Sequence, residues 1–336
     1  MKNWKSALLT ENTSIYDAIK NLEYTGLQII LILNDRKQFI GTLTDGDIRS
    51  GILKGQSLSS SVKNLVNRRP KIAKPNWSYE KALQLMNKFT INHIPIINKK
   101  KITGVFTRNS NLTNQKKDNI ILVMAGGRGK RNMPFTKSIP KPLLKYKNKM
   151  LIDIILNKIK KEGFENVFIS IRYLKDKIIK KLNKNKKDDL KLNYLVENKP
   201  LGTVGCLSKL KNKTSKPILI TNCDIVTDLK YKKLINFHVK EKSDLTVVIK
   251  EYKTQNPFGR IKIKNRKIVE MVEKPINMSY INAGIYVINS TLLKHIPKNK
   301  YYDMNEFILK LMKFKKKIVP YPIVDKWNDV SQYLKK

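Results

Sequence analysis

The sequence predicts a mixed α/β protein in two parts, and two patterns support this. Residues 1 to about 112 contain two copies of one motif, each with a helix and two strands. From residue 119 onward, strands alternate with helices, which implies a mainly parallel sheet with both faces covered. At 336 residues the chain is long enough for two domains, each with its own core.

The repeat in the first part is visible in residues that recur 63 or 64 positions apart. The aligned pairs are Ser14 and Ser78, Ala18 and Ala82, Leu22 and Met86, Gly41 and Gly104, and Thr44 and Thr107. Each copy predicts an N-capped amphipathic helix, a β-branched strand, a polar turn and a second strand. A unit this small buries little by itself, so the two copies are expected to pack on each other.

Each copy ends in a G-x-x-T segment, and the repeat resembles a tandem pair of CBS domains (a Bateman module). This regulatory module often binds adenosyl nucleotides through a G-h-x-T/S-x-x-D motif. The segment "GTLTDGD" fits the motif with Thr44 and Asp47, whereas "GVFTRNS" keeps Thr107 but has Ser110 in place of Asp. The resemblance implies a CBS ligand at Thr44, Asp47 and Thr107. The alternative is a packing and dimerisation module without a ligand.

The second part begins after a polar segment without periodicity, residues 108–118. We expect a first domain at 1–112, a linker at 113–118 and a second domain at 119–336. "NIILVM" at 119–124 predicts a buried strand, and "MLIDIILNKIKKEG" predicts a helix that ends at Gly163. Further strands are expected at "NVFISI", "LNYLVE", "PILIT", "DLTVVIKEY", "GRIKIK", "KIVEMV" and "YINAGIYVIN".

The net charge of +43 at pH 7 would suit a nucleic-acid binder, but the kind of cation argues against that class. Only 10 of the 69 basic residues are Arg, and the Lys residues are spread along the whole chain. Proteins that read bases favour Arg, whose planar fork matches base edges and phosphates. We therefore expect no nucleic-acid partner, while the positive charge should attract anionic small molecules.

The two cysteines, Cys206 and Cys223, lack a metal-binding spacing such as C-x-x-C, so we expect packing roles and a reducing compartment. The N-terminus has no long apolar core like that of a signal peptide, and no apolar run is long enough to span a bilayer. These features predict a soluble, cytoplasmic protein without a membrane partner.

The segment "MAGGRGKRNMPFTKSIPKPLL" at residues 124–144 directly follows the first predicted strand of the second domain. Ligands of α/β folds lie outside the carboxyl ends of strands, and consecutive small residues let backbone N–H groups converge on an anion. The segment is neither a Walker A loop nor a G-x-G-x-x-G loop, because Asn132 stands at the third glycine. Alone, it is a weak sign of phosphate binding.

Later segments strengthen this interpretation. The glycine-rich loop resembles the signature G-G-x-G-T-R-L-x-P-x-T…P-K-P of the sugar-1-phosphate nucleotidyltransferases, also called sugar-nucleotide pyrophosphorylases. The segments that match the same family in order are "LGTVG" (201–205), "TNCDI" (221–225), "NPFGRIK" (256–262), "EKP" (273–275), "NAGIYV" (282–287) and "WNDV" (327–330). The match runs from residue 120 to about 333 and implies a Rossmann-like, GT-A-like fold with a mixed, mainly parallel sheet.

The resemblance implies roles for individual residues. The nucleoside triphosphate would be bound by Ala125, Gly126, Gly127, Gly129, Gly202 and Thr203, and the sugar phosphate by Gly259, Glu273, Lys274 and Asn282. Arg131 would hold the leaving pyrophosphate and Lys141 the reacting phosphates, where fixed positive charge lowers the barrier. Asp224, also a catalytic residue, and Asp329 would bind Mg²⁺, which takes a few carboxylates together with phosphate oxygens.

Three residues depart from the family's pattern. Lys130 stands where the family usually has Thr, Asn132 where it has Leu, and Cys223 where it has Gly before the metal-binding Asp. Lys130 could add a phosphate contact or disturb the turn, whereas Asn132 removes an apolar anchor. The competing interpretation of Asp224 and Asp329 is a turn or N-cap carboxylate. The competing interpretation of Arg131 and Lys141 is that each is a solvent-exposed charge without a ligand.

The resemblance therefore implies an Mg²⁺-dependent enzyme of the EC 2.7.7 class, which transfers a nucleoside monophosphate from a triphosphate to a sugar-1-phosphate. The combination with a CBS pair resembles a bacterial subgroup that makes nucleotide sugars for legionaminic-type nonulosonic acids or surface glycans. There, GTP and glucosamine-1-phosphate give GDP-glucosamine, and we expect this reaction, in a homo-oligomer. The alternatives are a mannose- or glucose-1-phosphate enzyme with another base, and a nucleotide-sensing CBS protein without turnover.

Overall fold

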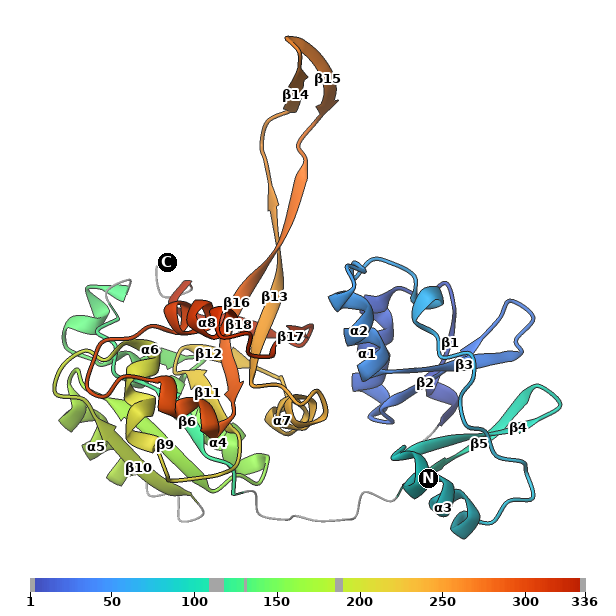
Figure 1. Cartoon of the computed structure of the whole chain (residues 1–336), viewed down its shortest axis with the longest axis horizontal. Helices are drawn as coiled ribbons and strands as arrows, with labels where there is room; N and C mark the ends of the chain where they lie inside the picture. Colours follow the sequence, from blue (N-terminus) through green and yellow to red (C-terminus); the bar gives the residue numbers. More distant parts are fainter. Residues whose placement is uncertain (1–3, 109–117, 130–131, 185–189, 333–336) are drawn as a thin grey trace. The chain divides into compact units, whose positions relative to one another are not determined.

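The computed structural model describes residues 4–108, 118–129, 132–184 and 190–332. The chain divides into two compact units, Met1–Thr113 and Asn114–Lys336. Figure 1 shows their elements, coloured along the sequence. Each unit has hydrophobic clusters of its own, so each is described by itself.

The first unit contains both copies of the repeat. Its elements are η1 (Trp4–Ala7), β1 (Leu8–Thr10), α1 (Ile15–Thr25), β2 (Ile29–Leu33), β3 (Phe39–Thr44), α2 (Asp45–Leu53), η2 (Val62–Leu65), α3 (Tyr79–Phe89), β4 (His93–Asn98) and β5 (Lys101–Thr107). β1 is parallel to β2, β2 is antiparallel to β3, and β4 and β5 form a hairpin. Ile102 and Val105 of the second copy pack against the hydrophobic cluster of the first, as expected for two copies that share a core.

Helices α1 and α3 begin at the serines that the repeat aligns. Ser14 accepts a hydrogen bond from the backbone N–H of Asp17 at 3.0 Å, and Ser78 accepts one from Lys81 at 3.3 Å. Each serine thereby satisfies a backbone N–H that the first helical turn leaves without an intrahelical partner. The predicted N-caps are confirmed.

The second unit is built on a seven-stranded sheet in the order β10–β9–β6–β11–β16–β13–β17. In chain order these strands are β6 (Ile121–Met124), β9 (Asn166–Ile171), β10 (Lys191–Val196), β11 (Ile218–Asn222), β13 (Leu245–Gln255), β16 (Ile276–Ile288) and β17 (Ile318–Ile323). β16 runs antiparallel to β11 and β13, and the other neighbouring pairs are parallel. The predicted mixed, mainly parallel sheet is confirmed.

Helices cover both faces of this sheet (Figure 1). The described helices and 3₁₀ turns of the second unit are η4 (Phe135–Lys137), η5 (Lys141–Leu143), α4 (Leu151–Lys161), α5 (Lys175–Lys184), α6 (Gly202–Gly205), η6 (Cys206–Leu210), α7 (Tyr231–Lys240), η7 (Ser290–His295), α8 (Met304–Lys313) and η8 (Val330–Gln332). Ile121 and Val123 belong to a cluster with α4, α5 and α7, whereas Leu122 belongs to another with η6, η7 and α8. Successive strand residues point to opposite faces, which explains the uninterrupted apolar run of β6.

Helix α4 shows how local sequence sets an element's end. Its apolar residues line one buried face, and Gly163 follows the helix with φ of +77°. Glycine adopts this left-handed conformation without steric cost, so the predicted C-terminus is confirmed. None of the described helices has both the length and the apolar character needed to cross a membrane.

Three short two-stranded pairs complete the second unit. They are β7 (Lys145–Tyr146) with β8 (Lys149–Met150), β12 (Ile225–Thr227) with β18 (Trp327–Asp329), and β14 (Arg260–Lys264) with β15 (Lys267–Val272). The β12–β18 pair joins the segment after β11 to the C-terminal end of the described chain, and this brings "TNCDI" and "WNDV" side by side.

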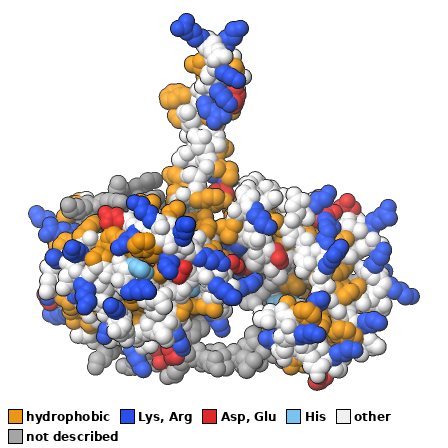
Figure 2. All heavy atoms as spheres, viewed as in Figure 1, with side chains coloured by type: hydrophobic (Ala, Val, Ile, Leu, Met, Phe, Trp, Pro, Cys, Tyr) orange, Lys and Arg blue, Asp and Glu red, His pale blue; other side chains and the backbone are white. Residues whose placement is uncertain are grey.

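Residues 251–280, which we call the arm, extend beyond the sheet as a two-stranded ribbon of β13 and β16 that ends in β14 and β15 (Figure 1). Hydrophobic side chains lie beside Lys and Arg on its surface (Figure 2). Its exposed hydrophobic residues are Tyr252, Phe258, Ile261, Ile263, Ile268, Val269, Met271, Ile276, Met278 and Tyr280. Because an isolated hairpin is only marginally stable, the arm depends on the sheet from which it emerges.

Candidate active site

A cavity of about 350 Å³ opens at the carboxyl ends of four neighbouring parallel strands of the second unit. The segments that follow β6, β9, β10 and β11 line it, together with residues before α8. The lining residues are Met124, Gly126, Gly127, Gly129, Lys141, Arg172, Glu197, Pro200, Leu201, Gly202, Thr203, Asn222, Cys223, Asp224, Tyr301 and Asp303. The glycine-rich loop, "LGTVG" and "TNCDI" therefore meet in one cavity.

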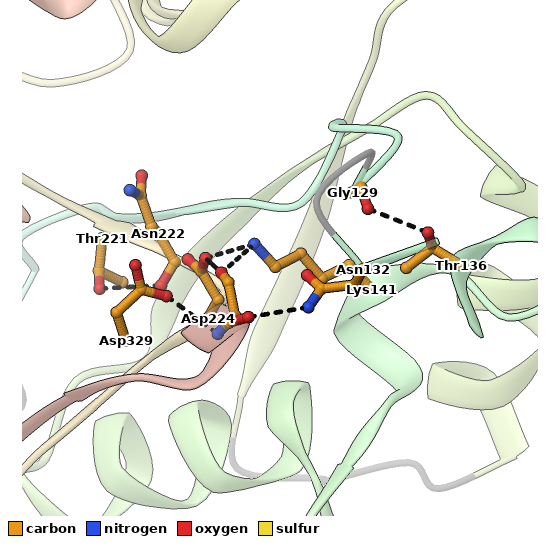
Figure 3. A network of polar contacts seen from close by, with 9 residues as sticks. Gly129, Asn132, Thr136, Lys141, Thr221, Asn222, Asp224 and Asp329 are labelled. Carbon is orange, nitrogen blue, oxygen red and sulfur yellow. Dashed lines mark hydrogen bonds and ion pairs between the residues drawn. The ribbon is translucent and has the colours of Figure 1, made fainter. Parts of the chain in front are cut away.

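The glycine-rich loop leaves β6 with little side-chain bulk on the cavity side. Ala125 is buried, and its N–H donates to Ser170 O at 2.9 Å, so it anchors the loop. A Cβ added at Gly127 would have no described atom within 4 Å, which leaves room for a ligand. Gly129 has φ of +62°, and Thr136 donates to its carbonyl at 3.0 Å (Figure 3). Lys130 and Arg131 lie outside the described residues, so the role of Arg131 remains a prediction.

Asn132, which the sequence marked as a lost apolar anchor, ties the glycine-rich loop to the C-terminal segment. Its side chain is buried, and Nδ2 donates to the carbonyl of Ser331 at 3.0 Å. Its backbone N–H donates to Gly129 O at 2.8 Å. Within the described part of the chain its Oδ1 has no partner, although it is buried. A buried hydrogen bond from Asn132 therefore takes the place of the expected apolar contact.

Lys141 and Asp224 form an ion pair in the cavity (Figure 3). The Ser331 hydroxyl contacts both side chains. Lys141 Nζ donates to Asp224 Oδ2 and, at 2.8 Å, to Ser331 Oγ. The Ser331 hydroxyl in turn donates to Asp224 Oδ2 at 2.7 Å. Burial would raise the pKa of Asp224, but the Lys141 ammonium and the hydrogen bonds from Lys141 and Ser331 hold that pKa below its usual value. Asp224 is therefore a carboxylate at neutral pH.

Asp329 stands next to this pair but has a structural contact of its own. It lies opposite Ile225 in the β12–β18 ladder, and its Oδ1 accepts from the Ser331 N–H at 3.0 Å. It is not among the described residues that line the cavity. The described residues contain no cluster of three or more His, Cys, Asp or Glu side chains suited to a metal ion. Mg²⁺ needs no such cage, because it takes one or two carboxylates plus phosphate oxygens, and the ionised, cavity-lining Asp224 fits that requirement.

The "LGTVG" segment is fixed by residues near the start of α8. Gly202 has φ of +72°, and a Cβ there would lie 2.5 Å from the Tyr302 carbonyl oxygen. The Thr203 N–H donates to Asp303 Oδ1 at 3.2 Å, and Thr203 Oγ1 accepts from the Met304 N–H at 2.8 Å. Asp303 was not a predicted site residue, because its partner lies 100 positions away.

Glu197 and Arg172 also line the cavity and were not predicted. Each is the first residue after a strand, β10 and β9, and that position could have marked them. Glu197 is 6% exposed and accepts hydrogen bonds from Ser170 Oγ and, at 3.1 Å, from the Leu201 N–H. A buried carboxylate is conspicuous in a cavity that is expected to hold a polyanion.

The cysteines have the packing role that the sequence suggests. Both are unpaired and buried. Burial raises the pKa of each thiol to about 12, so neither is a thiolate at neutral pH.

The residues expected to bind the sugar phosphate are not among the described residues that line the cavity. Gly259, Glu273 and Lys274 are on the arm, where a Cβ at Gly259 would be 3.0 Å from Glu273 Oε2. Asn282 pairs with Ile249 where the arm leaves the sheet, and its side chain accepts from the Gly284 N–H at 3.0 Å. None of these four is among the described residues of the cavity wall, and their roles remain predictions.

In the first unit, Thr44 and Asp47 bond to each other. Thr44 caps α2, and both its N–H and its hydroxyl donate to Asp47 Oδ2, at 2.8 and 2.6 Å. Thr107 ends β5, and its carbonyl accepts from the Tyr79 hydroxyl at 3.4 Å. The motif thus forms a helix cap in the first copy, and a nucleotide at these residues remains a prediction.

Comparison with known proteins agrees with both units. The family model described as nucleotidyl transferase matches residues 120–333, and that of the CBS domain matches residues 5–54 and 62–110. Mannose-1-phosphate guanyltransferase of Aspergillus fumigatus is 31% identical over 184 residues, which make up 52% of this chain and 50% of that protein. The catalytic subunit beta of the Drosophila melanogaster mannose-1-phosphate guanylyltransferase is 28% identical over 63% of this chain and 59% of its own length. The chain thus spans about half the length of the fungal relatives it matches.

Solved structures support the fold of the second unit. HddC from Yersinia pseudotuberculosis superposes with a TM-score of 0.50 and 24% identity, over 63% of this chain and 94% of that chain. A protein from Bacillus anthracis described as a putative glucose-1-phosphate thymidylyltransferase gives a TM-score of 0.51 with 20% identity, over 63% and 90%. At these identities the likeness concerns the fold.

Proposed function

Because this chain belongs to the nucleotidyl transferase family, we propose that it joins a nucleoside monophosphate to a sugar-1-phosphate. An oxygen of the sugar phosphate attacks the α-phosphorus of a nucleoside triphosphate, the bond from that phosphorus to the bridging oxygen breaks, and pyrophosphate leaves. The observation that carries the proposal is the convergence of a glycine-rich loop, two cationic side chains and Asp224 in one cavity. Such a transfer needs positioning and charge neutralisation more than acid–base chemistry.

The cavity residues divide between these tasks. The backbone around Gly126, Gly127 and Gly129 would face the triphosphate, and Lys141 and Arg172 would supply positive charge to it. Asp224 would hold Mg²⁺, with phosphate oxygens as its other ligands. When bound, the metal neutralises charge on the phosphates.

We propose GTP as the nucleotide. The curated relatives are named as guanyltransferases, and Glu197 supplies a matching group in the cavity. A carboxylate only accepts hydrogen bonds, and guanine presents two adjacent donors, N1–H and N2–H₂, on one edge. Among the described residues each Glu197 oxygen has one hydrogen-bond donor, so each retains acceptor capacity. For the acceptor we propose glucosamine-1-phosphate, and mannose-1-phosphate is its main rival because the relatives are named for it.

A matrix of four triphosphates against glucosamine-, mannose- and glucose-1-phosphate, scored by pyrophosphate release with Mg²⁺, tests the proposal. We expect the strongest signal with GTP, and its loss on chelation of the metal. A silent matrix in which nucleotide binding persists would instead support the nucleotide-sensing alternative. The same assay with added AMP, ATP or S-adenosylmethionine tests the CBS pair, which we propose to be a regulatory site for an adenosyl nucleotide.

Glu197→Gln is expected to lower kcat/KM with GTP by roughly 10- to 100-fold, because one charge-assisted hydrogen bond to the base is lost. Glutamine has the same shape and can keep an acceptor for the Leu201 N–H, so the loop should stay folded. Steady-state kinetics with each triphosphate measure the effect. A loss that is equal for all four bases would contradict base recognition by Glu197 and leave it a structural role.

A further inference from the structure

In the described part of the chain, the side-chain hydrogen bonds of Asp224 converge on one of its two oxygens. Lys141 Nζ and Ser331 Oγ both donate to Oδ2, and the side chains of Asp224 and Lys141 are only 13% and 17% exposed. In such surroundings two opposite charges attract more strongly than in water. The ammonium of Lys141 is therefore the counter-ion of Asp224 in the free protein.

Asp224 and Lys141 would each have another partner when substrate binds. Both line the cavity. A divalent cation brought in with the triphosphate requires the Asp224 carboxylate, and the triphosphate oxygens require the Lys141 ammonium. Two cations on one carboxylate oxygen repel each other, so Lys141 and a bound metal ion exclude one another there.

We propose that Lys141 blocks the metal-binding oxygen of Asp224 in the free protein and leaves it when metal and nucleotide bind. The inference rests on the proposed function for the identity of the ligand. The flexible four-carbon stem of Lys141 allows the ammonium to turn from the carboxylate toward phosphate oxygens. Metal binding and the release of a cationic side chain to the triphosphate thereby become one coupled step.

Ser331 is the positioning residue of this exchange. Its hydroxyl contacts both Lys141 and Asp224, while its backbone is held by Asn132 on one side and by Asp329 on the other. Because the backbone contacts do not involve the hydroxyl, Ser331 stays in place when Lys141 leaves. Its hydroxyl then continues to donate to Asp224 Oδ2 and keeps the carboxylate oriented.

Binding of Mn²⁺ to the full-length protein without nucleotide, followed by electron paramagnetic resonance, tests the exchange. Lys141→Met removes the competing cation and is expected to bind Mn²⁺ at least about tenfold more tightly than the wild type. The double variant Lys141→Met, Asp224→Asn should lose that gain, which assigns it to Asp224. Lys145→Met is the matched control, since it removes one exposed positive charge from β7 and should leave the affinity unchanged.

A Lys141→Met protein that binds Mn²⁺ no more tightly than the wild type, or an equal gain in Lys145→Met, overturns the proposal. Lys141→Arg tests whether the gain comes from loss of the charge, because it keeps a positive charge and should bind Mn²⁺ as weakly as the wild type. Urea unfolding of each variant checks that it is folded. In Ser331→Ala the Lys141→Met gain should shrink, and Ser331→Thr should restore it. No substrate is present in these measurements, so they remain decisive even if every pair in the substrate matrix is silent.

Discussion

We expect replacement of Asp224 by Asn to lower kcat for pyrophosphate release by about 10³-fold or more, because a metal ion on this carboxylate would be worth several kcal/mol of charge stabilisation in the transition state. Asn has nearly the same shape and can still accept a hydrogen bond from Ser331, so the change removes charge and little else. Steady-state kinetics over a range of Mg²⁺ concentrations measure the effect. Urea unfolding of the same variant checks that the fold survives.

Asp329→Asn provides the comparison. The Asp329 carboxylate accepts the backbone N–H of Ser331 and so orients Ser331, but Asp329 is not among the described residues of the cavity wall. We therefore expect kcat to fall only about tenfold. The order of the two effects is the test. If Asp329→Asn proves as damaging as Asp224→Asn, the two carboxylates bind the metal as equal partners. If Asp224→Asn keeps more than a tenth of the wild-type rate, Asp224 is not the metal ligand.

The fold could be predicted in detail because its signals are local. The run of β6 is apolar on both faces, the serines at the start of α1 and α3 cap their helices, and Gly163 ends α4 in a left-handed conformation. Each of these signals depends on residues within one or two turns of the chain. The order of strands in the sheet is not local and was not predicted, because the alternation of strands and helices indicates only that most strands are parallel.

The site could be predicted only in part. Gly127, Lys141 and Asp224 were chosen because their motifs resemble those of the family, and all three line the cavity. Ser331 could not be found in this way, because it meets Lys141 across 190 positions and Asn132 across 199. A serine with such partners looks like any other surface serine in the sequence. The same reason explains why Asn132 was read as a loss, when its amide instead replaces an apolar contact with a hydrogen bond.

The arm shows another limit of sequence patterns. The alternating residues of β14 and β15 were correctly expected to form strands, yet Ile261, Ile263 and Ile268 are exposed. Alternating apolar and polar residues indicate that a strand has an apolar face, but they do not indicate which part of the protein covers that face. For this reason the placement of Glu273 and Lys274 relative to the cavity could not be read from the sequence.

We expect two glycines of the cavity to be required for different reasons, Gly127 for ligand binding and Gly202 for the stability of the fold. Gly127→Ala adds a methyl group to a place where no described atom lies within 4 Å, so the free energy of unfolding should stay within about 0.5 kcal/mol of the wild type. If the triphosphate lies against the loop, that methyl group meets it, and GTP affinity should fall at least about tenfold. Gly202→Ala should destabilise the protein by at least about 2 kcal/mol, since an L residue at φ of +72° is strained and its Cβ would lie 2.5 Å from the Tyr302 carbonyl oxygen.

Urea unfolding and calorimetric GTP binding of the two variants separate these causes. In Gly202→Ala both quantities should change, because Thr203 can keep its hydrogen bonds to Asp303 and Met304 only while the turn at Gly202 persists. In Gly127→Ala only the binding should change. A Gly127→Ala protein with wild-type GTP affinity would place the triphosphate away from the glycine-rich loop. Loss of stability in Gly127→Ala would instead mean that the open space beside Gly127 is occupied in the free protein.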